Sequence, residues 1–339
     1  MATPEQERLQ QGLRAMAPQL HPEGTAIEAL QRLSGGASQE TWSFDLRLAD
    51  GGLRPLILRR APAGADARGA SAATLAEQAA LQSAAAAAGV PVPEVVLLLQ
   101  PAHGVGEGYA MQRIDGETLG RRIVGDARLA SARQGLARQC GQALARLHRM
   151  PETELPPLRR ASPAAELAHY EQQYRSHGLH KPVFELALHW LKAHAPADDT
   201  PLAPVHGDFR NGNLMVGEDG LRAVLDWELA HWGDPMEDLG WLCVTSWRFG
   251  RLELPVGGFG TREQLFAGYA EAGGRVDAAR VHYWEVFGTL KWGVICQSMA
   301  HAYLTGTERN VERAAIGRRA SEAEIDLLTL LAPRARKAA

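Results

Sequence analysis

Two acidic residues and one amide stand at fixed intervals in the second half of this 339-residue chain. Asp208 and Asn213 lie five residues apart in the segment VHGDFRNGN (205–213), and Asp226 follows thirteen residues after Asn213 in the segment LDWE (225–228). Asp and Asn commonly cap turns, but a capping role predicts neither these spacings nor the second acid. The pattern therefore indicates a site at which two carboxylates and one carboxamide act together.

Phosphoryl transfer needs these residue types in this order. The spacing matches a kinase catalytic loop, H-R-D-x-x-x-x-N, followed by a metal-binding Asp. In such a loop Asp208 would accept the proton of an acceptor hydroxyl, while Asn213 and Asp226 would bind Mg²⁺ against the β- and γ-phosphates of a nucleotide. The sequence thus predicts a phosphoryl-transfer site with Asp208 as the general base.

The residues that follow carry a resemblance to a known family. With the turn Gly233-Asp234-Pro235 and the pair Asp238-Leu239, the motif resembles the aminoglycoside phosphotransferase and choline kinase-like family, small-molecule kinases that share the protein-kinase fold. The stretch from Leu225 to Gly250 also resembles the kinase domains associated with acyl-CoA dehydrogenases. The resemblance covers about residues 25–310. It implies ATP and Mg²⁺, and it leaves GTP open as the nucleotide.

Hydrophobic periodicity predicts a strand-rich first lobe over residues 1–115, which begins with an N-terminal helix. Strands are expected over 27–33, 41–48, 54–59, 94–99 and 109–113, and a helix over 71–88 that Gly89 and Pro91 end. Residues 116–339 are expected to form a mostly helical second lobe with helices over 131–149, 164–176, 183–194, 261–272, 280–304 and 321–331. The predicted fold class is α+β, a bilobal protein-kinase-like fold with a five-stranded antiparallel sheet and one helix in its first lobe. The second lobe would hold the catalytic loop (205–213), the metal segment (225–238) and the acceptor pocket.

Three positions in the first lobe are expected to contact phosphates or support that contact. Small residues at 34–38 let backbone N–H groups approach an anion closely, and the family resemblance places Ser38 there; a plain hairpin turn is the alternative. Arg59 stands where the third strand of a kinase carries its phosphate-pairing Lys, with Arg60 as the alternative, because strand alternation turns only one of the two toward the nucleotide. Glu77 is the expected acidic partner, and a solvated Glu is the alternative.

Backbone groups at residues 111–114 are expected to read the edge of the adenine ring, which places Gln112 and Ile114 at the nucleotide. Two other residues are expected to support the catalytic loop. Asp238 resembles the family acid that accepts hydrogen bonds from backbone N–H groups of that loop. His206 is expected to orient the loop as a hydrogen-bonded core histidine, because Asp208 already stands where the acceptor hydroxyl arrives.

The acceptor leaves a weaker trace in the sequence. Residues 151–200 carry seven acids against five Lys and Arg, a balance that does not favour a polycationic acceptor. Trp247 and Arg248 belong to an aromatic and basic group that suits an apolar acceptor bearing a carboxylate or phosphate, although such aromatics often lie in the core. The likeness to domains associated with acyl-CoA dehydrogenases suggests a hydroxyacyl acceptor. The predicted function is transfer of the γ-phosphoryl group of ATP to a hydroxyl of such a small molecule.

Three other functions stay open. A true aminoglycoside or other antibiotic kinase would use the same residues on a different acceptor. A nucleotide-binding scaffold without transfer activity is favoured by the missing third-strand Lys. A metal-dependent hydrolase built on His206, Asp208 and Asp226 is disfavoured, because the chain has no H-x-H or H-E-x-x-H pattern near them.

The composition of the chain limits the classes of partner that it is expected to bind. A net charge of −3 with mixed signs gives no polycationic face, so neither nucleic acid nor an anionic membrane is indicated. Three scattered cysteines without a C-x-x-C pair are expected to be core thiols in a reducing cytoplasm. The N-terminus lacks the pattern of a signal peptide, and no apolar run reaches the ~18 residues of a membrane span. The expected partner is a small molecule, and the oligomeric state is not set by the sequence.

Overall fold

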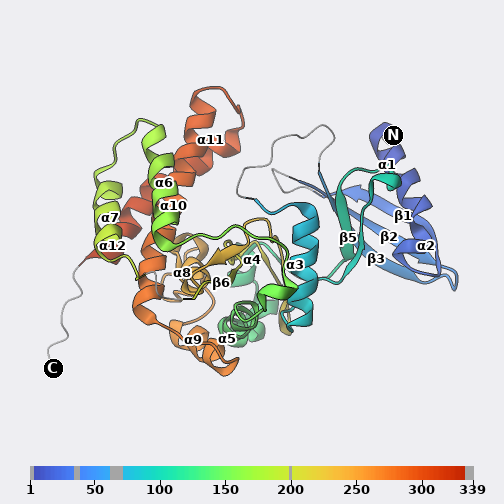
Figure 1. Cartoon of the computed structure of the whole chain (residues 1–339), viewed down its shortest axis with the longest axis horizontal. Helices are drawn as coiled ribbons and strands as arrows, with labels where there is room; N and C mark the ends of the chain where they lie inside the picture. The colour runs from blue at the N-terminus through green and yellow to red at the C-terminus, as the bar shows by residue number, and fades with distance from the viewer. Residues whose placement is uncertain (1–3, 34–38, 62–71, 198–200, 333–339) are drawn as a thin grey trace. The chain divides into compact units, whose positions relative to one another are not determined.

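The computed structural model describes residues 4–33, 39–61, 72–197 and 201–332 and divides into two compact units (Figure 1). The first unit comprises Met1–Gly116 with two later segments, Met150–Leu158 and Arg222–Ala230. The second comprises Glu117–Arg149, Arg159–Leu221 and His231–Ala339. The segment that holds Asp226 therefore belongs to the first unit, whereas Asp208 and Asn213 belong to the second.

The first unit is built on one antiparallel sheet. Its strand order is β1-β2-β3-β5-β4, with all neighbours antiparallel, which confirms the predicted five-stranded sheet. The strands are β1 (Gly24–Arg32), β2 (Glu40–Leu48), β3 (Leu53–Arg60), β4 (Val95–Leu98) and β5 (Gly108–Gln112), and the helices are α1 (Pro4–Ala15), α2 (Ala17–Leu20) and α3 (Leu75–Ala87).

Side-chain alternation gives this sheet two apolar faces. Leu56 and Leu58 of β3 join a buried cluster with Leu9 and Leu13 of α1, so the predicted N-terminal helix covers that face. Ile57 points the other way and packs with Leu75, Ala79, Tyr109 and Met111, which brings α3 against the opposite face. Because the side-chain period of a strand is two residues, Arg59 shares the α3 face and Arg60 shares the α1 face.

The second unit is mostly helical and is organised around the long helix α10 (Ala278–Leu304). Helices α6, α7, α8, α11 and α12 contact α10, and α5 packs against α9 (Figure 1). Their bounds are α4 (Gly120–Gly125), α5 (Ala130–Leu147), α6 (Pro163–Ser176), α7 (Pro182–Ala193), α8 (Met236–Cys243), α9 (Arg262–Glu271), α11 (Val311–Gly317) and α12 (Ala320–Leu331). The short strands of this unit are β6 (Ala203–Val205), which pairs with β9 (His231–Gly233), and β7 (Leu214–Gly217). Strand β8 (Gly220–Val224) begins in this unit, and its residues 222–224 belong to the first.

The predicted helices of this unit are all present, and their ends differ from the predicted ones by at most two residues. Helices α4, α8 and α11 were not predicted, and α8 is the one of these that supports the catalytic loop. It runs from Met236 to Cys243. All eight of its residues are buried, so its sequence lacks the polar face that marks an amphipathic helix. In the part of the chain that the structure describes, none of the helices has the length and apolarity needed to cross a membrane.

Candidate active site

The loop that carries Asp208 begins directly after β6 and is fixed by a buried carboxylate on α8. Asp238 accepts hydrogen bonds from the backbone N–H groups of His206 (2.8 Å) and Gly207 (2.9 Å), and it lies 3.0 Å from Nε2 of His148. Burial alone would raise the pKa of Asp238, but its interactions with His148 and His206 outweigh burial and hold the pKa below its ordinary value. An ionised Asp238 thus anchors the start of the loop.

His206 is fully buried, and its Nδ1 accepts a hydrogen bond from the backbone N–H of Asp208 at 3.3 Å. Its ring packs edge-on against Phe209. The side chain therefore lies inside the unit and orients the loop from within.

Three donors surround the carboxylate of Asp208. Its Oδ1 accepts hydrogen bonds from the Trp241 indole (2.8 Å) and from Nε of Arg210 (2.9 Å). Its Oδ2 accepts one from Nδ2 of Asn213 at 2.7 Å. The side chain of Asp208 remains 17% exposed, so the carboxylate is oriented by the protein and still open to solvent.

The amide of Asn213 has a defined orientation. Its Nδ2 donates to both Oδ2 and the backbone carbonyl of Asp208, at 2.7 and 2.9 Å. With the nitrogen used in this way, the amide oxygen is left as the atom that can bind a cation. The five-residue spacing of the sequence motif is what brings these two side chains together.

The rest of the loop is held by the segment that follows α8. The buried Asn211 donates from Nδ2 to the carbonyls of Trp247 (3.0 Å) and Gly257 (2.6 Å). The guanidinium of Arg210 lies 4.7 Å from the centre of the Trp247 ring, and Trp247 itself packs against Trp241. Trp247 is therefore a buried support beneath Arg210.

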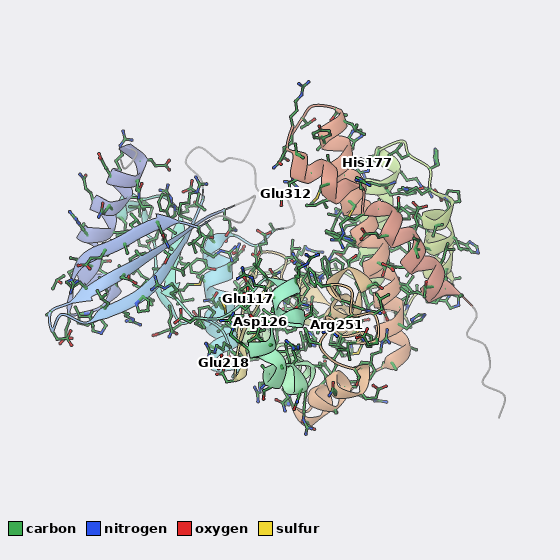
Figure 2. The ribbon with its side chains drawn as sticks, turned by 180° about the vertical axis from the view of Figure 1, so that it is seen from behind. Glu117, Asp126, His177, Glu218, Arg251 and Glu312 are labelled. Carbon is green, nitrogen blue, oxygen red and sulfur yellow. The ribbon has the colours of Figure 1, made fainter. Side chains whose placement is uncertain are left out.

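The structure corrects the expectation for Arg248. Its guanidinium donates to the carbonyl of Cys243 (2.7 Å) and pairs with Glu285 (2.9 Å). Glu285 is buried and also binds Arg262. A buried carboxylate needs cationic partners, so Arg248 is committed to the interior. Arg251 of the same sequence stretch is an exposed surface residue (Figure 2) and pairs with Glu253 at 3.7 Å.

The first unit contributes Arg59 and Asp226. Arg59 donates to Oδ1 of Asp226 at 2.9 Å and to Oε1 of Gln39 at 3.1 Å. Burial would lower the pKa of Arg59, but Tyr109 and the Asp226 carboxylate outweigh it and raise the pKa. Arg60, on the other face of the sheet, pairs with the buried Glu40 at 2.7 Å. Of the two arginines, Arg59 is therefore the one that meets the predicted metal segment.

Asp226 adopts an unusual backbone conformation. Its φ is +65°, in the left-handed region that residues other than Gly seldom adopt. Such conformations cost of order 1–3 kcal/mol and concentrate at functional sites. The side chain of Asp226 is 35% exposed, and within the described residues only its Oδ1 has a hydrogen-bond partner.

The expected pairing of Arg59 with Glu77 is not what the structure shows. Glu77 is the third residue of α3, and its carboxylate accepts a hydrogen bond from the backbone N–H of Thr74 at 2.6 Å. Thr74 in turn caps the N–H of Glu77, a reciprocal capping box. Glu77 is thus used to begin the helix, and among the described residues the carboxylate on Arg59 is that of Asp226.

The other residues predicted to contact the nucleotide are Gln112, Ile114 and Ser38, and they differ in burial and in backbone hydrogen bonding. Gln112 is the exposed last residue of β5, and its N–H is bonded to the carbonyl of Glu94 at 2.8 Å. Ile114 is half-buried, and within the described ranges neither its N–H nor its C=O has a backbone hydrogen bond. Ser38 lies outside the described residues.

Comparison with known proteins identifies the family. The model of the phosphotransferase enzyme family matches residues 29–275, and the chain belongs to that family. Acyl-CoA dehydrogenase family member 10 of Mus musculus is 30% identical over 256 residues, which are 72% of this chain and 22% of that protein. A probable acyl-CoA dehydrogenase of Arabidopsis thaliana, IBR3, is 26% identical over 82% of this chain and 37% of its own. The chain thus spans well under half the length of these relatives.

Solved structures show the same fold. A Ralstonia eutropha JMP134 protein provisionally assigned as an aminoglycoside phosphotransferase has a TM-score of 0.74 and 21% identity, covering 94% of this chain and 97% of that one. Spectinomycin phosphotransferase has a TM-score of 0.64 and 14% identity, covering 94% and 98%. The predicted protein-kinase-like fold and family are therefore confirmed, and together they support a small-molecule kinase.

Proposed function

We propose that this protein transfers the γ-phosphoryl group of ATP to a hydroxyl group of a small molecule, with Asp208 as the general base. The observation that carries this proposal is the carboxylate of Asp208, which is oriented by three donors and remains open to solvent. In the reaction a bond forms between the acceptor oxygen and the γ-phosphorus, and the bond from that phosphorus to the β-phosphate oxygen breaks. The acceptor proton passes to Asp208, and ADP leaves.

Two oxygen donors fit Mg²⁺, a hard cation that prefers carboxylate and carboxamide ligands. The amide oxygen of Asn213 is free because its nitrogen is bonded to Asp208. Asp226 keeps one carboxylate oxygen without a partner among the described residues. When bound, the metal would neutralise charge on the phosphates as the phosphoryl group moves.

Arg59 and Ile114 are the residues proposed to bind the nucleotide. Arg59 is a guanidinium on the sheet strand where kinases carry their phosphate-pairing cation, and its planar fork can bind phosphate oxygens in pairs. The free backbone groups of Ile114 suit recognition of the adenine edge. The same groups could read a guanine edge, so GTP stays an alternative donor.

The proposed acceptor is an anionic or hydroxyacyl compound, and the residue that supports this class is Arg210 rather than Arg248. The Arg210 side chain stands directly at Asp208, and within the described residues its Nη2 has no hydrogen-bond partner. A cation at this position favours an acceptor that carries a carboxylate or phosphate near its hydroxyl. It disfavours a polycation such as an aminoglycoside, because like charges repel at short range.

The test is incubation with ATP, Mg²⁺ and a panel of hydroxy acids, hydroxyacyl thioesters, amino alcohols and aminoglycosides, followed by mass measurement of each product. We expect a phosphorylated product from an anionic member, and Arg210→Gln should raise KM for that acceptor. Efficient transfer to aminoglycosides alone would contradict the anionic acceptor and favour the alternative of an antibiotic kinase. Tight ATP binding with no transfer to any member would favour the scaffold alternative.

A further inference from the structure

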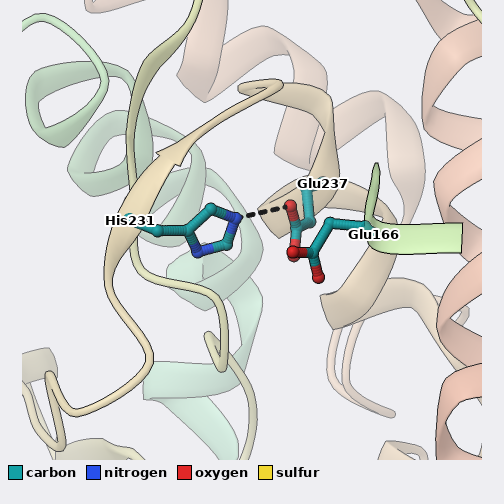
Figure 3. Close-up of side chains that lie close together, drawn as sticks. All are labelled: Glu166, His231 and Glu237. Atoms are coloured by element: carbon teal, nitrogen blue, oxygen red, sulfur yellow. Dashed lines mark ion pairs between the residues drawn. The ribbon is translucent and has the colours of Figure 1, made fainter. Parts of the chain in front are cut away.

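Three buried ionisable side chains meet behind the catalytic loop, within the second unit. Glu166 of α6, His231 of β9 and Glu237 of α8 are exposed by 5%, 1% and 3%. Figure 3 shows them facing one another, with Nε2 of His231 at 3.3 Å from Oε2 of Glu237. Nitrogen or oxygen atoms of the three lie within 4.8 Å of one another. Charge at this depth must be balanced by nearby charge of opposite sign.

Two further cations reach this cluster. Arg159 pairs with Glu166, and Lys291 of α10 is buried with its ammonium 5.5 Å from the Tyr170 ring centre. Burial alone would lower the pKa of Lys291, but Tyr170 and the carboxylates of Glu237, Glu166 and Asp208 outweigh it and raise the pKa. Lys291 therefore stays charged inside the unit.

The surroundings of His231 favour its protonated form. Burial would lower its pKa, but Glu237 outweighs burial and raises the pKa. Arg159 and Lys291 thus lie with His231 around the buried side chains of Glu166 and Glu237. The cluster has a geometry that could hold a metal ion, but the cationic side chains of Arg159 and Lys291 already interact with its carboxyl groups.

Lys291 connects this cluster to the loop that carries the proposed base. Its Nζ donates to the carbonyl of Gly207 at 3.3 Å, directly before Asp208 in the chain. The same ammonium lies 4.7 Å from the centre of the Trp241 ring, within the range of a cation–π contact. Trp241 is the residue whose indole N–H donates to Asp208. Lys291 therefore touches both the backbone and the ring that set the position of the Asp208 carboxylate.

We infer that Lys291 is a positioning residue for Asp208, held in place by the buried cluster of Glu166, His231 and Glu237. The inference rests on the proposed function for its kinetic consequence, but its structural consequence can be measured without turnover. Removing the ammonium would release the Gly207 carbonyl and the Trp241 ring together. A displacement of the base of about 1 Å costs on the order of 10²-fold in rate.

The test compares Lys291→Met with the matched control Lys181→Met, whose lysine pairs with Glu324 on the remote α12. Lys291→Met should lower kcat by about 10²-fold and leave the Kd for ATP unchanged. It should also speed hydrogen exchange in peptides covering residues 203–213 and 236–243, without affecting α5 or α9. Lys181→Met should change none of these. Lys291→Gln, which can still donate to Gly207 but loses the cation–π contact with Trp241, should show the same changes to a smaller extent, and it replaces the Met variant if that variant does not fold.

The two proposals fail separately. If the wild-type protein transfers no phosphoryl group, the exchange measurement still tests whether Lys291 holds the loop. Unchanged exchange and unchanged kcat in the Lys291 variants would overturn the inference, and so would faster exchange throughout the second unit, which indicates general destabilisation. A stoichiometric transition metal in the purified protein that is lost in Glu237→Gln would overturn the role given to the cluster of Glu166, His231 and Glu237, because these side chains would then bind a metal ion instead of holding Lys291.

Discussion

The carboxylate of Asp208 is held by donors that come from two places in the sequence. Arg210 and Asn213 lie in its own loop, whereas Trp241 lies 33 residues further along, on α8. Asp238 on the same helix fixes the backbone that precedes Asp208. One short buried helix therefore sets both the backbone and the side-chain orientation of the proposed base.

The two proposed metal ligands differ in charge, since Asp226 is a carboxylate and Asn213 is neutral, so substitutions at the two positions should have different effects on metal binding. Asp226→Asn keeps a residue that tolerates positive φ and removes the formal charge, so we expect it to raise the Mg²⁺ concentration needed for ATP binding. The increase should be at least the roughly 10–100-fold that loss of an outer metal-site partner costs. Asn213→Ala removes a neutral ligand and should have a smaller effect. Calorimetric titration of ATP at several Mg²⁺ concentrations measures both, and an unchanged Mg²⁺ requirement in Asp226→Asn would remove Asp226 from the metal site.

At the scale of elements, two helices of the second unit approach each other through glycine. A Cβ on Gly141 of α5 would lie 2.1 Å from the carbonyl oxygen of Leu265 in α9, and one on Gly268 would lie 2.0 Å from that of Arg138. These nearest atoms belong to the backbone, which cannot move aside as the end of a flexible side chain can. The α5–α9 contact thus depends on small residues in both helices. Gly135, also in α5, has no atom within 4 Å of such a Cβ.

These two glycines of α5 give a matched pair with opposite expected signs. Gly141→Ala should destabilise the protein by about 1–3 kcal/mol, because the added methyl group overpacks the helix contact. Gly135→Ala should stabilise it by about 0.8–1 kcal/mol, because Ala is the better helix former in open space. Thermal unfolding of both variants measures the difference. A shift of the same sign at both positions would show that the α5–α9 contact is looser than these distances indicate.

The sequence predicted the elements well wherever one face of an element is apolar and the other polar. The alternation in β2 and β3 indicated the five-stranded sheet, and helical spacing located α5 and α10. It could not locate α8, because a helix buried on all sides has no periodic pattern. Glu77 was read as an ion-pair partner although Thr74 and Glu77 form the S/T-x-x-E signature of a capping box, so in that case the signal was present in the sequence.

Side-chain partners from distant segments were the least predictable part of the site. The spacing of Asp208 and Asn213 predicted two residues that do lie together, since a short loop leaves few arrangements. The inward orientation of the Arg248 side chain and the contact of Lys291 with Gly207 are both set by residues far away in the sequence. Arg248 turns inward because Glu285, 37 residues later, is buried. Lys291 reaches the backbone of Gly207 because α10 packs against α8.

At the scale of the whole molecule, the proposed residues are divided between the two units. Arg59 and Asp226 belong to the first, because residues 222–230 fold with the sheet. Asp208, Asn213, Trp241 and Lys291 belong to the second. The matched region makes up 22% of one relative and 37% of another. The proposed activity therefore concerns the phosphotransferase region alone and does not extend to the remaining parts of these longer relatives.

The measurement that tests the central claim most directly compares phosphoryl transfer and ATP binding in a single variant, Asp208→Asn. General-base assistance contributes roughly 10²–10⁴-fold, so transfer to the best acceptor should fall by that factor. Asn can still accept hydrogen bonds from Trp241 and Arg210, and the Asn213 amide keeps its bond to the backbone carbonyl of residue 208. The loop should therefore keep its structure, and calorimetry should find the Kd for ATP·Mg²⁺ unchanged. Loss of ATP binding in proportion to the loss of rate, or transfer at the wild-type rate, would contradict the assignment of Asp208 as the base of a phosphotransferase.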